Sequence, residues 1–227
     1  AQVINKRCIG CGNCVRVCSQ HAKAFIRLTT EVDQLLSSDK KVVAMVAPSF
    51  PAEFNEFTDY KILIGMIRAL GFDYVCEVAF GADLVSKEFN NLLKNNKPYI
   101  SSDCPAIVFY IEQYHPNLIK YLAPIASPMV ATARVMKQKY GEDIETVFIG
   151  PCVAKKAESD ETSEELTFIE LREMFESHNI TPEGITPSDF DPPYAGKGAI
   201  FPVSRGLLQT IDATEDVYDG RIIAAEG

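Results

Sequence analysis

Residues 42–48 read VVAMVAP, and this stretch decides the fold class. Six consecutive apolar residues closed by Pro48 are typical of a buried strand in a parallel sheet. Residues 60–70 (YKILIGMIRAL) follow with helical spacing and stop at Gly71, a residue type that commonly ends helices. A buried strand followed by an amphipathic helix predicts an α/β fold with parallel sheet and right-handed crossovers.

The same alternation continues along the chain and supports this fold class. We expect further strands at residues 74–80, 98–102, 146–150 and 199–203, and further helices at residues 83–93, 106–113, 128–139 and 164–177. Residues 158–163 are acidic and residues 181–198 are rich in Pro, Asp and Gly, so we expect both to be exposed connectors. In such folds the chemistry lies just past the carboxyl ends of the strands.

The composition narrows the class of protein. The 227 residues are 47% hydrophobic and 23% charged, which is ordinary for a folded globular protein. The net charge of -9 argues against a protein that tracks nucleic-acid phosphates. We find no apolar run of 18 residues and no signal-peptide pattern, so we expect neither a membrane span nor secretion. The cysteine spacing indicates a reducing compartment, and we therefore expect a cytoplasmic protein.

Four of the seven cysteines form one short motif, CIGCGNCVRVC, with the spacing C-x2-C-x2-C-x3-C. This spacing is that of bacterial ferredoxins, which bind a [4Fe–4S] cluster. Glycines within the motif let the loop curl so that several thiolates converge. We predict that the metal ligands are Cys8, Cys11, Cys14 and Cys18. Zinc is the alternative, although structural zinc sites usually pair two distant C-x2-C units. A disulfide cluster fits the reducing compartment less well.

The role of Cys18 stays open. In two-cluster ferredoxins the first three cysteines bind one cluster and the fourth binds the other. Only one such run is present, and Ser19 stands where proline is usual. Either Cys18 closes the same cluster, or one ligand lies outside this chain.

Two further cysteines follow predicted strands and precede predicted helices. Cys104 lies in SSDCPA and Cys152 lies in FIGPCVAKK. The amides of a helix N-terminus favour a thiolate, and Lys155 adds positive charge for an anionic ligand. The alternatives are that each cysteine is a small buried hydrophobe and that Lys155 is solvated helix surface. Cys76, in the middle of a predicted strand, is interpreted as core.

These motifs resemble a known family. SSDCP at 101–105 and GPCVAKKAE at 150–158 resemble the first two signature motifs of the [FeFe]-hydrogenase catalytic domain, with VAPSF, FGADLV and SPMV as further similar segments. The leading ferredoxin run is similar to the electron relay of those enzymes. The resemblance implies a ferredoxin-type segment over residues 1–30 and an iron-only hydrogenase-like α/β domain over residues 41–227. It implies two lobes of parallel sheet with helices and a cluster in the cleft between them.

The resemblance also implies a cofactor and roles for residues. The family's H-cluster is a [4Fe–4S] cube joined to a di-iron unit that carries CO and cyanide. Cys104 and Cys152 would be cube ligands, and Lys155 would donate a hydrogen bond to a cyanide. Pro48 and Ser49 would line the di-iron pocket.

Asp103 departs from the family pattern. The family usually has a cysteine there, which serves as the last proton relay. A carboxyl group has a reference pKa near 3.9 against about 8.5 for a thiol, so it would usually rest ionised unless buried. We therefore consider two roles for Asp103, a proton relay in a tuned or slow catalyst and a helix N-cap.

The third signature motif, which supplies two more cysteine ligands, does not occur in this sequence. No cysteine follows Cys152, so the chain as given cannot hold a complete H-cluster. We expect a fragment trimmed at both ends, whose complete protein has two more cysteines downstream of Gly227. The alternative is a family member that has lost the cofactor.

Three functions follow from the resemblance. The first is an oxidoreductase that interconverts protons and H2, with ferredoxin or another redox protein as partner; the chain alone would be inactive. The second is hydrogen or redox sensing with an attached sensor or output domain, which Asp103 favours. The third is a scaffold for iron–sulfur assembly that has lost the H-cluster, against which the segment AKK argues mildly.

Overall fold

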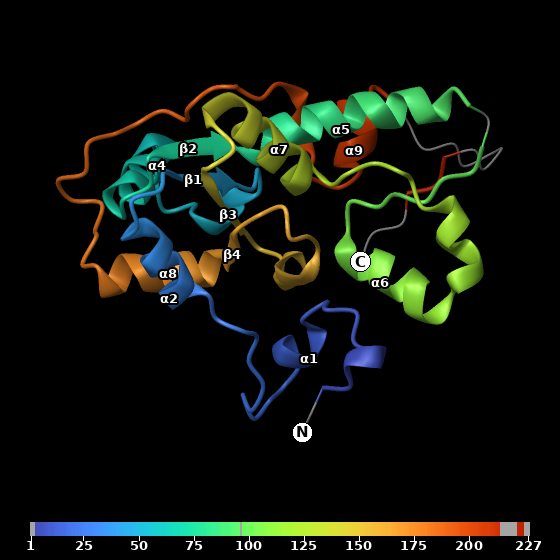
Figure 1. The fold of residues 1–227 in the computed structure, drawn as a ribbon, viewed down its shortest axis with the longest axis horizontal. Coiled ribbons are helices and arrows are strands. Elements are labelled where there is room, and N and C mark those ends of the chain that lie inside the picture. The colour runs from blue at the N-terminus through green and yellow to red at the C-terminus, as the bar shows by residue number, and fades with distance from the viewer. Residues whose placement is uncertain (1–2, 96, 214–221, 225–227) are drawn as a thin grey trace.

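The computed structural model describes residues 3–95, 97–213 and 222–224. Within these ranges four strands form one parallel sheet in the order β2-β1-β3-β4 (Figure 1). They are β1 (Val42–Val46), β2 (Tyr74–Glu77), β3 (Glu145–Gly150) and β4 (Glu164–Thr167). The predicted α/β class is confirmed, and the decisive stretch VVAMV is the fully buried strand β1.

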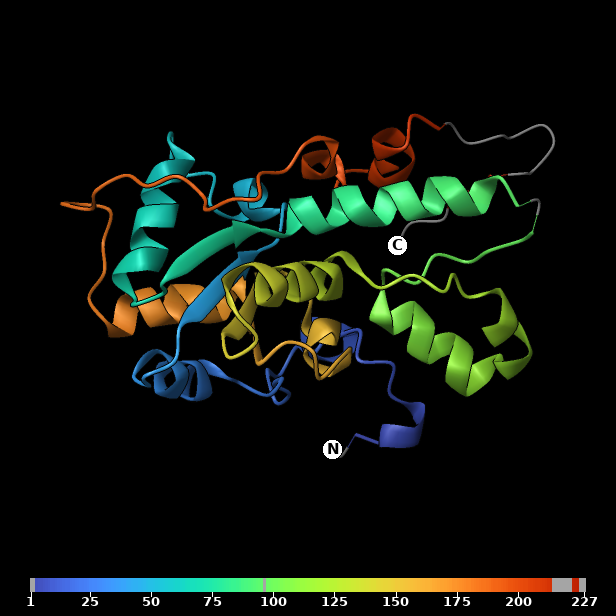
Figure 2. The same cartoon turned by 45° about the horizontal axis from the view of Figure 1, so that its top comes forward.

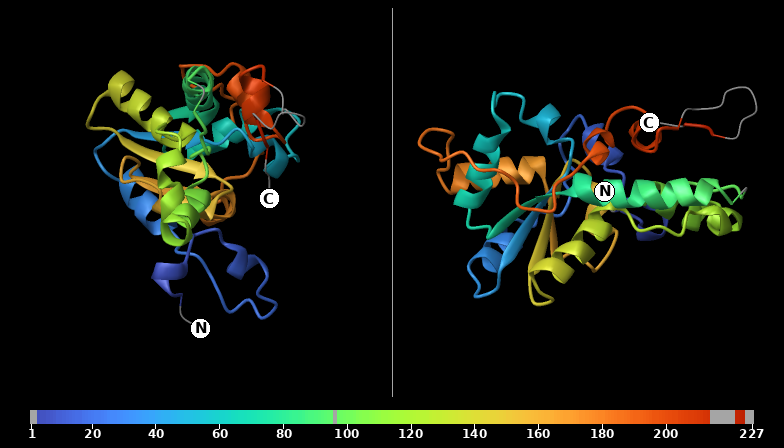
Figure 3. Two further views of the ribbon diagram at one scale, coloured as in Figure 1. Left: turned by 90° about the vertical axis from the view of Figure 1, so that its right-hand side faces the viewer. Right: turned by 90° about the horizontal axis from the view of Figure 1, so that it is seen from above.

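Helices cover both faces of this sheet because each face is apolar. α4 (Tyr60–Ala69) and α8 (Phe168–Ser177) lie on one face, and α7 (Pro128–Tyr140) lies on the other (Figures 2 and 3). α7 also packs along the long helix α5 (Val78–Leu93). The predicted helices at 60–70, 83–93 and 128–139 are confirmed, and α5 begins five residues earlier than expected.

Two predicted boundaries were wrong for local reasons. The strand expected at 74–80 ends at Glu77, because residues 78–81 already pack as helix against α7: a Cβ on Gly81 would lie 2.2 Å from Thr132 Oγ1. The helix expected at 164–177 begins only at Phe168, and residues 164–167 are strand β4. A capping box between Thr167 and Glu170 fixes that helix start.

Two predicted strands do not form. Residues 98–102 make only an isolated bridge between Ile100 and Leu122. Residues 199–203 continue from the 3-10 helix η4 (Lys197–Ile200) into turns. The reason is that the Asp83 carboxylate accepts the N–H groups of Gly196 and Gly198, at 2.6 Å each, which curls this segment against α5.

The connectors differ in burial. Residues 181–198 are largely exposed, as expected, and are irregular up to the start of η4; Phe190 and Gly198 are buried. The acidic stretch 158–165 is not the solvated loop that its charge suggested. Thr162 and Glu165 are buried there, and the Thr162 hydroxyl donates to the Glu165 carboxylate.

The remaining elements surround the sheet. They are η1 (Asn5–Arg7), α1 (Asn13–Arg16), α2 (Thr29–Leu36), α3 (Phe50–Glu53), α6 (Pro105–Tyr114), η2 (Pro116–Tyr121), η3 (Val153–Ala157) and α9 (Gly206–Thr210). None of the helices in the described ranges is long and apolar enough to cross a membrane.

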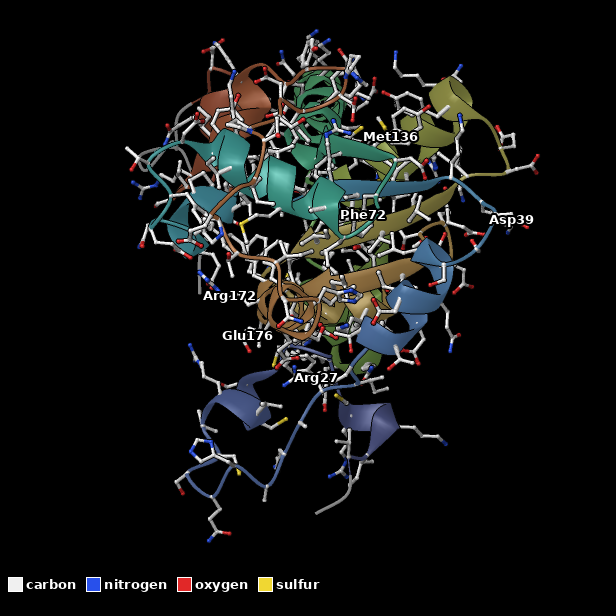
Figure 4. All side chains as sticks on the ribbon, turned by 90° about the vertical axis from the view of Figure 1, so that its left-hand side faces the viewer. Arg27, Asp39, Phe72, Met136, Arg172 and Glu176 are labelled. Atoms are coloured by element: carbon white, nitrogen blue, oxygen red, sulfur yellow. The ribbon has the colours of Figure 1, made fainter. Side chains whose placement is uncertain are left out.

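The N-terminal segment, residues 3–28, projects from the α/β body (Figures 1 and 3). Its last residues hold it to α8: Arg27 pairs with Glu173, and the N–H of Leu28 donates to Glu170 Oε1 at 2.8 Å. Figure 4 shows Arg27 where this segment meets the body, near Arg172 and Glu176 of α8. The segment is therefore a small appendage on a larger sheet domain.

Candidate metal centre

The sheet order places a topological switch point at the carboxyl ends of β1 and β3, and we call this region the candidate crevice. β1 connects toward β2 on one side and β3 toward β4 on the other, so the loops that leave these two strands diverge, which is where open α/β sheets bind ligands. Pro48 and Ser49 follow β1, and Cys152 follows β3 two residues after Gly150. The N–H of Ala47 donates to the Ile149 carbonyl at 2.8 Å. The predicted residues of these two loops therefore lie side by side.

Gly150 keeps the two strand ends close. A Cβ at this position would lie 3.0 Å from the Cβ of Ala47 and 2.5 Å from the ring of Phe148. The contact with Phe148 is closer than real Cβ atoms come and the contact with Ala47 is tighter than most, so a larger residue would have to displace the Phe148 ring and push the ends of β1 and β3 apart.

Lys155 joins the loop of Cys152 to the loop of Cys104. Its ammonium donates to the backbone carbonyl of Asp103 at 3.1 Å and to Glu158 Oε2 at 2.6 Å. The Lys155 and Glu158 side chains are only 12% and 13% exposed. Lys155 is therefore not solvated helix surface, and its charge is held between the two cysteine loops.

Both cysteines occupy helix N-caps. Cys104 is the N-cap of α6 and Cys152 the N-cap of η3, and neither side chain makes a capping hydrogen bond. Cys104 is exposed and Cys152 half-buried, so neither is the small core residue considered as an alternative. Cys76, in contrast, is fully buried as predicted, and burial raises the pKa of its thiol to about 12.

Asp103 does not cap α6, since Cys104 takes that position. Its Oδ2 accepts a hydrogen bond from the Ser101 hydroxyl, and its Oδ1 is buried without a partner among the described residues. Burial raises the pKa of Asp103 above its ordinary value, although the Ser101 hydrogen bond and the charge of Lys155 act in the opposite direction. Buried carboxyl oxygens in folded proteins usually have a hydrogen-bond partner, so this oxygen makes the Asp103 loop a candidate functional site.

The N-terminal loop has the backbone that converging thiols need. Gly10 and Gly12 adopt φ values of 71° and 73°, and the N–H of Gly10 points at Cys8 Sγ at 3.4 Å. Cys8 and Cys14 line a hollow of about 520 Å³. The pKa of Cys18 is lowered chiefly by the backbone N–H of Ala22, against some desolvation. Free thiols, amide donors and a favoured thiolate together fit the donor chemistry of an iron–sulfur cluster.

This loop docks on both elements that carry Cys104 and Cys152. A Cβ on Gly12 would lie 2.6 Å from Val153 Cγ2, the residue after Cys152. At the other end of α6, Gln113 Nε2 donates to the Cys8 carbonyl at 3.1 Å and the Tyr114 hydroxyl donates to the Arg7 carbonyl at 2.9 Å. The N-terminal segment therefore contacts the candidate crevice region through two elements.

Within the described ranges, no three His, Cys, Asp or Glu side chains are arranged so that they could hold a metal ion together. The four N-terminal thiols match a cube in number. The α/β domain supplies two, Cys104 and Cys152, where a cube takes four ligands. The N-terminal loop therefore has as many thiols as a [4Fe–4S] cube needs, and the candidate crevice has half of them.

Sequence reasoning missed Glu158, which it assigned to solvated surface. Glu158 is the ion-pair partner of Lys155. The i,i+3 spacing of these opposite charges was the available signal. It also missed the buried pair of Lys156 with Glu170, whose carboxylate binds the Leu28 N–H and thus the N-terminal segment.

Comparisons with known proteins identify the family of this chain. The sequence model described as "Iron only hydrogenase large subunit, C-terminal domain" matches residues 40–224, and that of the "4Fe-4S binding domain" matches residues 1–23. Iron hydrogenase 1 of Clostridium pasteurianum is 28% identical over 208 residues, which are 77% of this chain and 36% of that protein. The cytosolic Fe-S cluster assembly factor NAR1 of Yarrowia lipolytica is 27% identical over 182 residues, 70% of this chain and 37% of that protein.

Solved structures match the fold as well. A variant of the [FeFe]-hydrogenase from Chlamydomonas reinhardtii superposes with a TM-score of 0.69 at 25% identity, covering 81% of this chain and 56% of that one. The chain thus spans little more than a third of the curated relatives named above, and over half of this solved one.

Proposed function

Because this chain belongs to the iron-only hydrogenase large-subunit family, we propose that it serves an iron–sulfur oxidoreductase of the [FeFe]-hydrogenase type. The observation that carries the proposal is the docking of the N-terminal cysteine loop on both η3 and α6, the elements that begin at Cys152 and Cys104. An electron delivered to the N-terminal loop has a short protein path to the crevice through this contact.

Two cofactor sites are assigned. In the first, Cys8, Cys11, Cys14 and Cys18 would hold a [4Fe–4S] cluster. In the second, Cys104 and Cys152 would be two of the ligands of the cube of an H-cluster, and Pro48 and Ser49 would line the pocket of its di-iron unit. When bound, the H-cluster supplies the interconversion of protons and H2. Two cube ligands in this region are too few for that cofactor, so holding it would require further ligands from outside these 227 residues.

The chain's own residues hold charge and protons at the second site. Lys155 fixes the distance between the two cysteine loops, because one ammonium binds the Asp103 carbonyl and the Glu158 carboxylate. Its ammonium would supply positive charge to an anionic cofactor held by these loops. Asp103 is the proton relay, and Oδ1, the oxygen without a partner, is the atom that takes up and releases the proton.

Anaerobic reconstitution with iron and sulfide tests the cofactor sites. We expect a [4Fe–4S] signal in electron paramagnetic resonance after reduction, lost in Cys8→Ser or Cys14→Ser. Cys104→Ser and Cys152→Ser should leave this signal intact, and Cys76→Ser, in the core, is the matched control. Iron near zero with zinc bound instead would overturn the assignment.

A second candidate function is iron–sulfur assembly without hydrogen chemistry. It is favoured by the similarity to the NAR1 assembly factor. A scaffold passes its cluster to an apo-protein acceptor, whereas an electron relay retains it. Incubation of the reconstituted chain with an apo-ferredoxin, followed by separation and iron analysis, distinguishes the two. A sensing role would instead require an attached output domain that responds to H2 or redox state.

A further inference from the structure

A small hollow lies between α5 and the segment that carries η4 and α9. Its volume is about 230 Å³, and both α5 and residues 197–212 contribute to its walls. Figure 2 shows η4 and α9 along one side of α5 and α7 along the other, so the hollow lies on the side of α5 that α7 does not cover. No cysteine lines it, and it is therefore separate from both candidate cluster sites.

Asp83 holds one end of this hollow closed. Its two carboxylate oxygens accept the N–H groups of Gly196 and Gly198 at 2.6 Å each. A Cβ on Gly198 would collide with the carbonyl oxygen of Ala79, so the segment touches α5 closely there. Because both oxygens of Asp83 already bind amides, this carboxylate is committed to the fold and its charge is largely offset.

Ser86, one turn further along α5, has a buried hydroxyl without a partner. The residue is only 3% exposed and lines the hollow, and its Oγ has no hydrogen-bond partner among the residues that the structure describes. Thr210, the buried residue of the opposite wall, donates its hydroxyl to the Gly206 carbonyl at 2.7 Å. Buried hydroxyls are usually bonded in this way, and leaving one unbonded costs stability. Ser86 therefore keeps a free donor at the hollow.

The ionic group of the hollow that stays available is positive. Lys197 and Asp212 neutralise each other, since the ammonium binds the two carboxylate oxygens at 2.6 and 2.7 Å. Lys87 is exposed and forms no ion pair with any residue in the described ranges. The exposed Asn90 adds an amide, and the half-buried Ile211 adds an apolar surface. One unpaired ammonium, two neutral donors and an apolar wall therefore meet at this hollow.

We propose that the hollow binds a short-chain organic carboxylate. The carboxylate pairs with the Lys87 ammonium and accepts hydrogen bonds from the Ser86 hydroxyl and the Asn90 amide, and its alkyl chain packs on Ile211. A dianion such as phosphate is disfavoured, because it would face the carboxylate of Asp212 with only one unpaired ammonium to offset its charge. The bound ligand bridges α5 and residues 210–212, and it requires neither of the candidate clusters.

An NMR titration of the purified chain with propionate tests the site. We expect saturable shifts of the amides of Ser86, Asn90 and residues 210–212, with a dissociation constant on the order of 1 mM for a ligand of this size. Propionamide has the same shape without the charge and should bind about tenfold more weakly or worse. Phosphate at the same ionic strength should also bind more weakly than propionate.

Three variants separate the hollow from general surface charge. Lys87→Met should weaken propionate binding about tenfold, and Ser86→Ala should weaken it about threefold or more without lowering thermal stability. Lys94→Met makes the same charge change at the exposed end of α5, outside the hollow, and should alter the affinity less than about twofold.

Three results would overturn the proposal. They are an absence of saturable shifts, equal binding of propionate and propionamide, and equal affinities in wild type, Lys87→Met and Ser86→Ala. Equal weakening in Lys87→Met and Lys94→Met would do so as well, since the anion would then bind to surface charge alone. Because none of these measurements involves iron, their failure leaves the proposed function untouched.

Discussion

The ammonium of Lys155 donates a hydrogen bond to the backbone carbonyl of Asp103 at 3.1 Å, across 52 residues of sequence. This contact links the residue before Cys104 to the helix that begins at Cys152. The same ammonium pairs with Glu158. The Lys155 side chain therefore fixes the Cys104 loop relative to the Cys152 loop and places charge between them.

Replacing Lys155 should destabilise the fold because Glu158 loses its partner in a poorly hydrated place. We expect Lys155→Met to lower the free energy of unfolding by about 1–3 kcal/mol, as is typical when a poorly exposed polar or charged group loses its partner. Urea unfolding measures this change. The double variant K155M/E158Q should cost less than the sum of the two single variants, because it leaves no charge without a partner. Additive costs would mean that the ion pair contributes nothing.

Gly12 should be required for docking of the N-terminal loop. Gly12→Ala places a methyl group 2.6 Å from Val153 Cγ2 and forces alanine into φ 73°. The left-handed backbone costs roughly 1 kcal/mol and the overlap about 1–3 kcal/mol more. Hydrogen exchange of residues 3–28 should therefore accelerate.

Two variants separate the effect of the left-handed backbone on hydrogen exchange from the effect of the overlap with Val153. Gly184→Ala imposes a similar φ of 80° in open space and should leave that exchange unchanged. G12A/V153A removes the overlap and should restore part of the protection. If G12A alone leaves exchange of residues 3–28 unaltered, the loop does not dock on η3.

Glu170 should give a pH-dependent contribution to stability. Its carboxylate is fully buried, which by itself raises its pKa. The N–H groups of Thr167 and Leu28, the Thr167 hydroxyl and Lys156 outweigh burial, so the pKa lies below its ordinary value of 4.5. A lowered pKa means that the stabilisation is present above the ordinary pKa and lost as pH falls through the lowered one.

We therefore expect Glu170→Gln to cost about 3 kcal/mol at pH 7, since Lys156 is left nearly buried without its partner. The difference from wild type should shrink as pH falls below about 4.5. Glu173→Gln, which removes an exposed ion pair on the same helix, should cost less than about 1 kcal/mol. Thermal and urea unfolding between pH 3 and pH 7 measure both. A difference for Glu170→Gln that stays constant with pH would contradict the assignment.

Thr146 should tolerate loss of its hydroxyl. The residue is fully buried in β3, and its Oγ1 has no hydrogen-bond partner among the described residues. Thr146→Val keeps the shape and removes the unsatisfied group, so we expect stabilisation by about 1 kcal/mol. Thr132→Val is the matched control, because the equally buried Thr132 hydroxyl donates to the Pro128 carbonyl at 2.7 Å and its loss should destabilise. Destabilisation in both variants would indicate that Thr146 has a bound water as partner.

Much of the fold follows from local patterns in the sequence. The run VVAMV predicted β1, and the helical periodicity of 60–70 and 128–139 predicted α4 and α7. These predictions hold because continuous apolar runs and amphipathic periods leave few alternatives for burial. Residues 199–203 were predicted wrongly, because Asp83 on a distant helix binds the backbone just before them and curls it.

The sequence by itself determined which metal-binding groups the chain has, since four closely spaced cysteines and two further cysteine motifs can be read without coordinates. Only the tertiary structure decided which of these groups meet. Lys155 reaches Asp103, and Gly12 meets Val153, through contacts between residues 52 and 141 positions apart. Such contacts depend on strand order and on the packing of α6 and η3, which no local periodicity encodes. The low exposure of Glu158 depends on the same packing, whereas its acidic surroundings in the sequence had suggested an exposed connector.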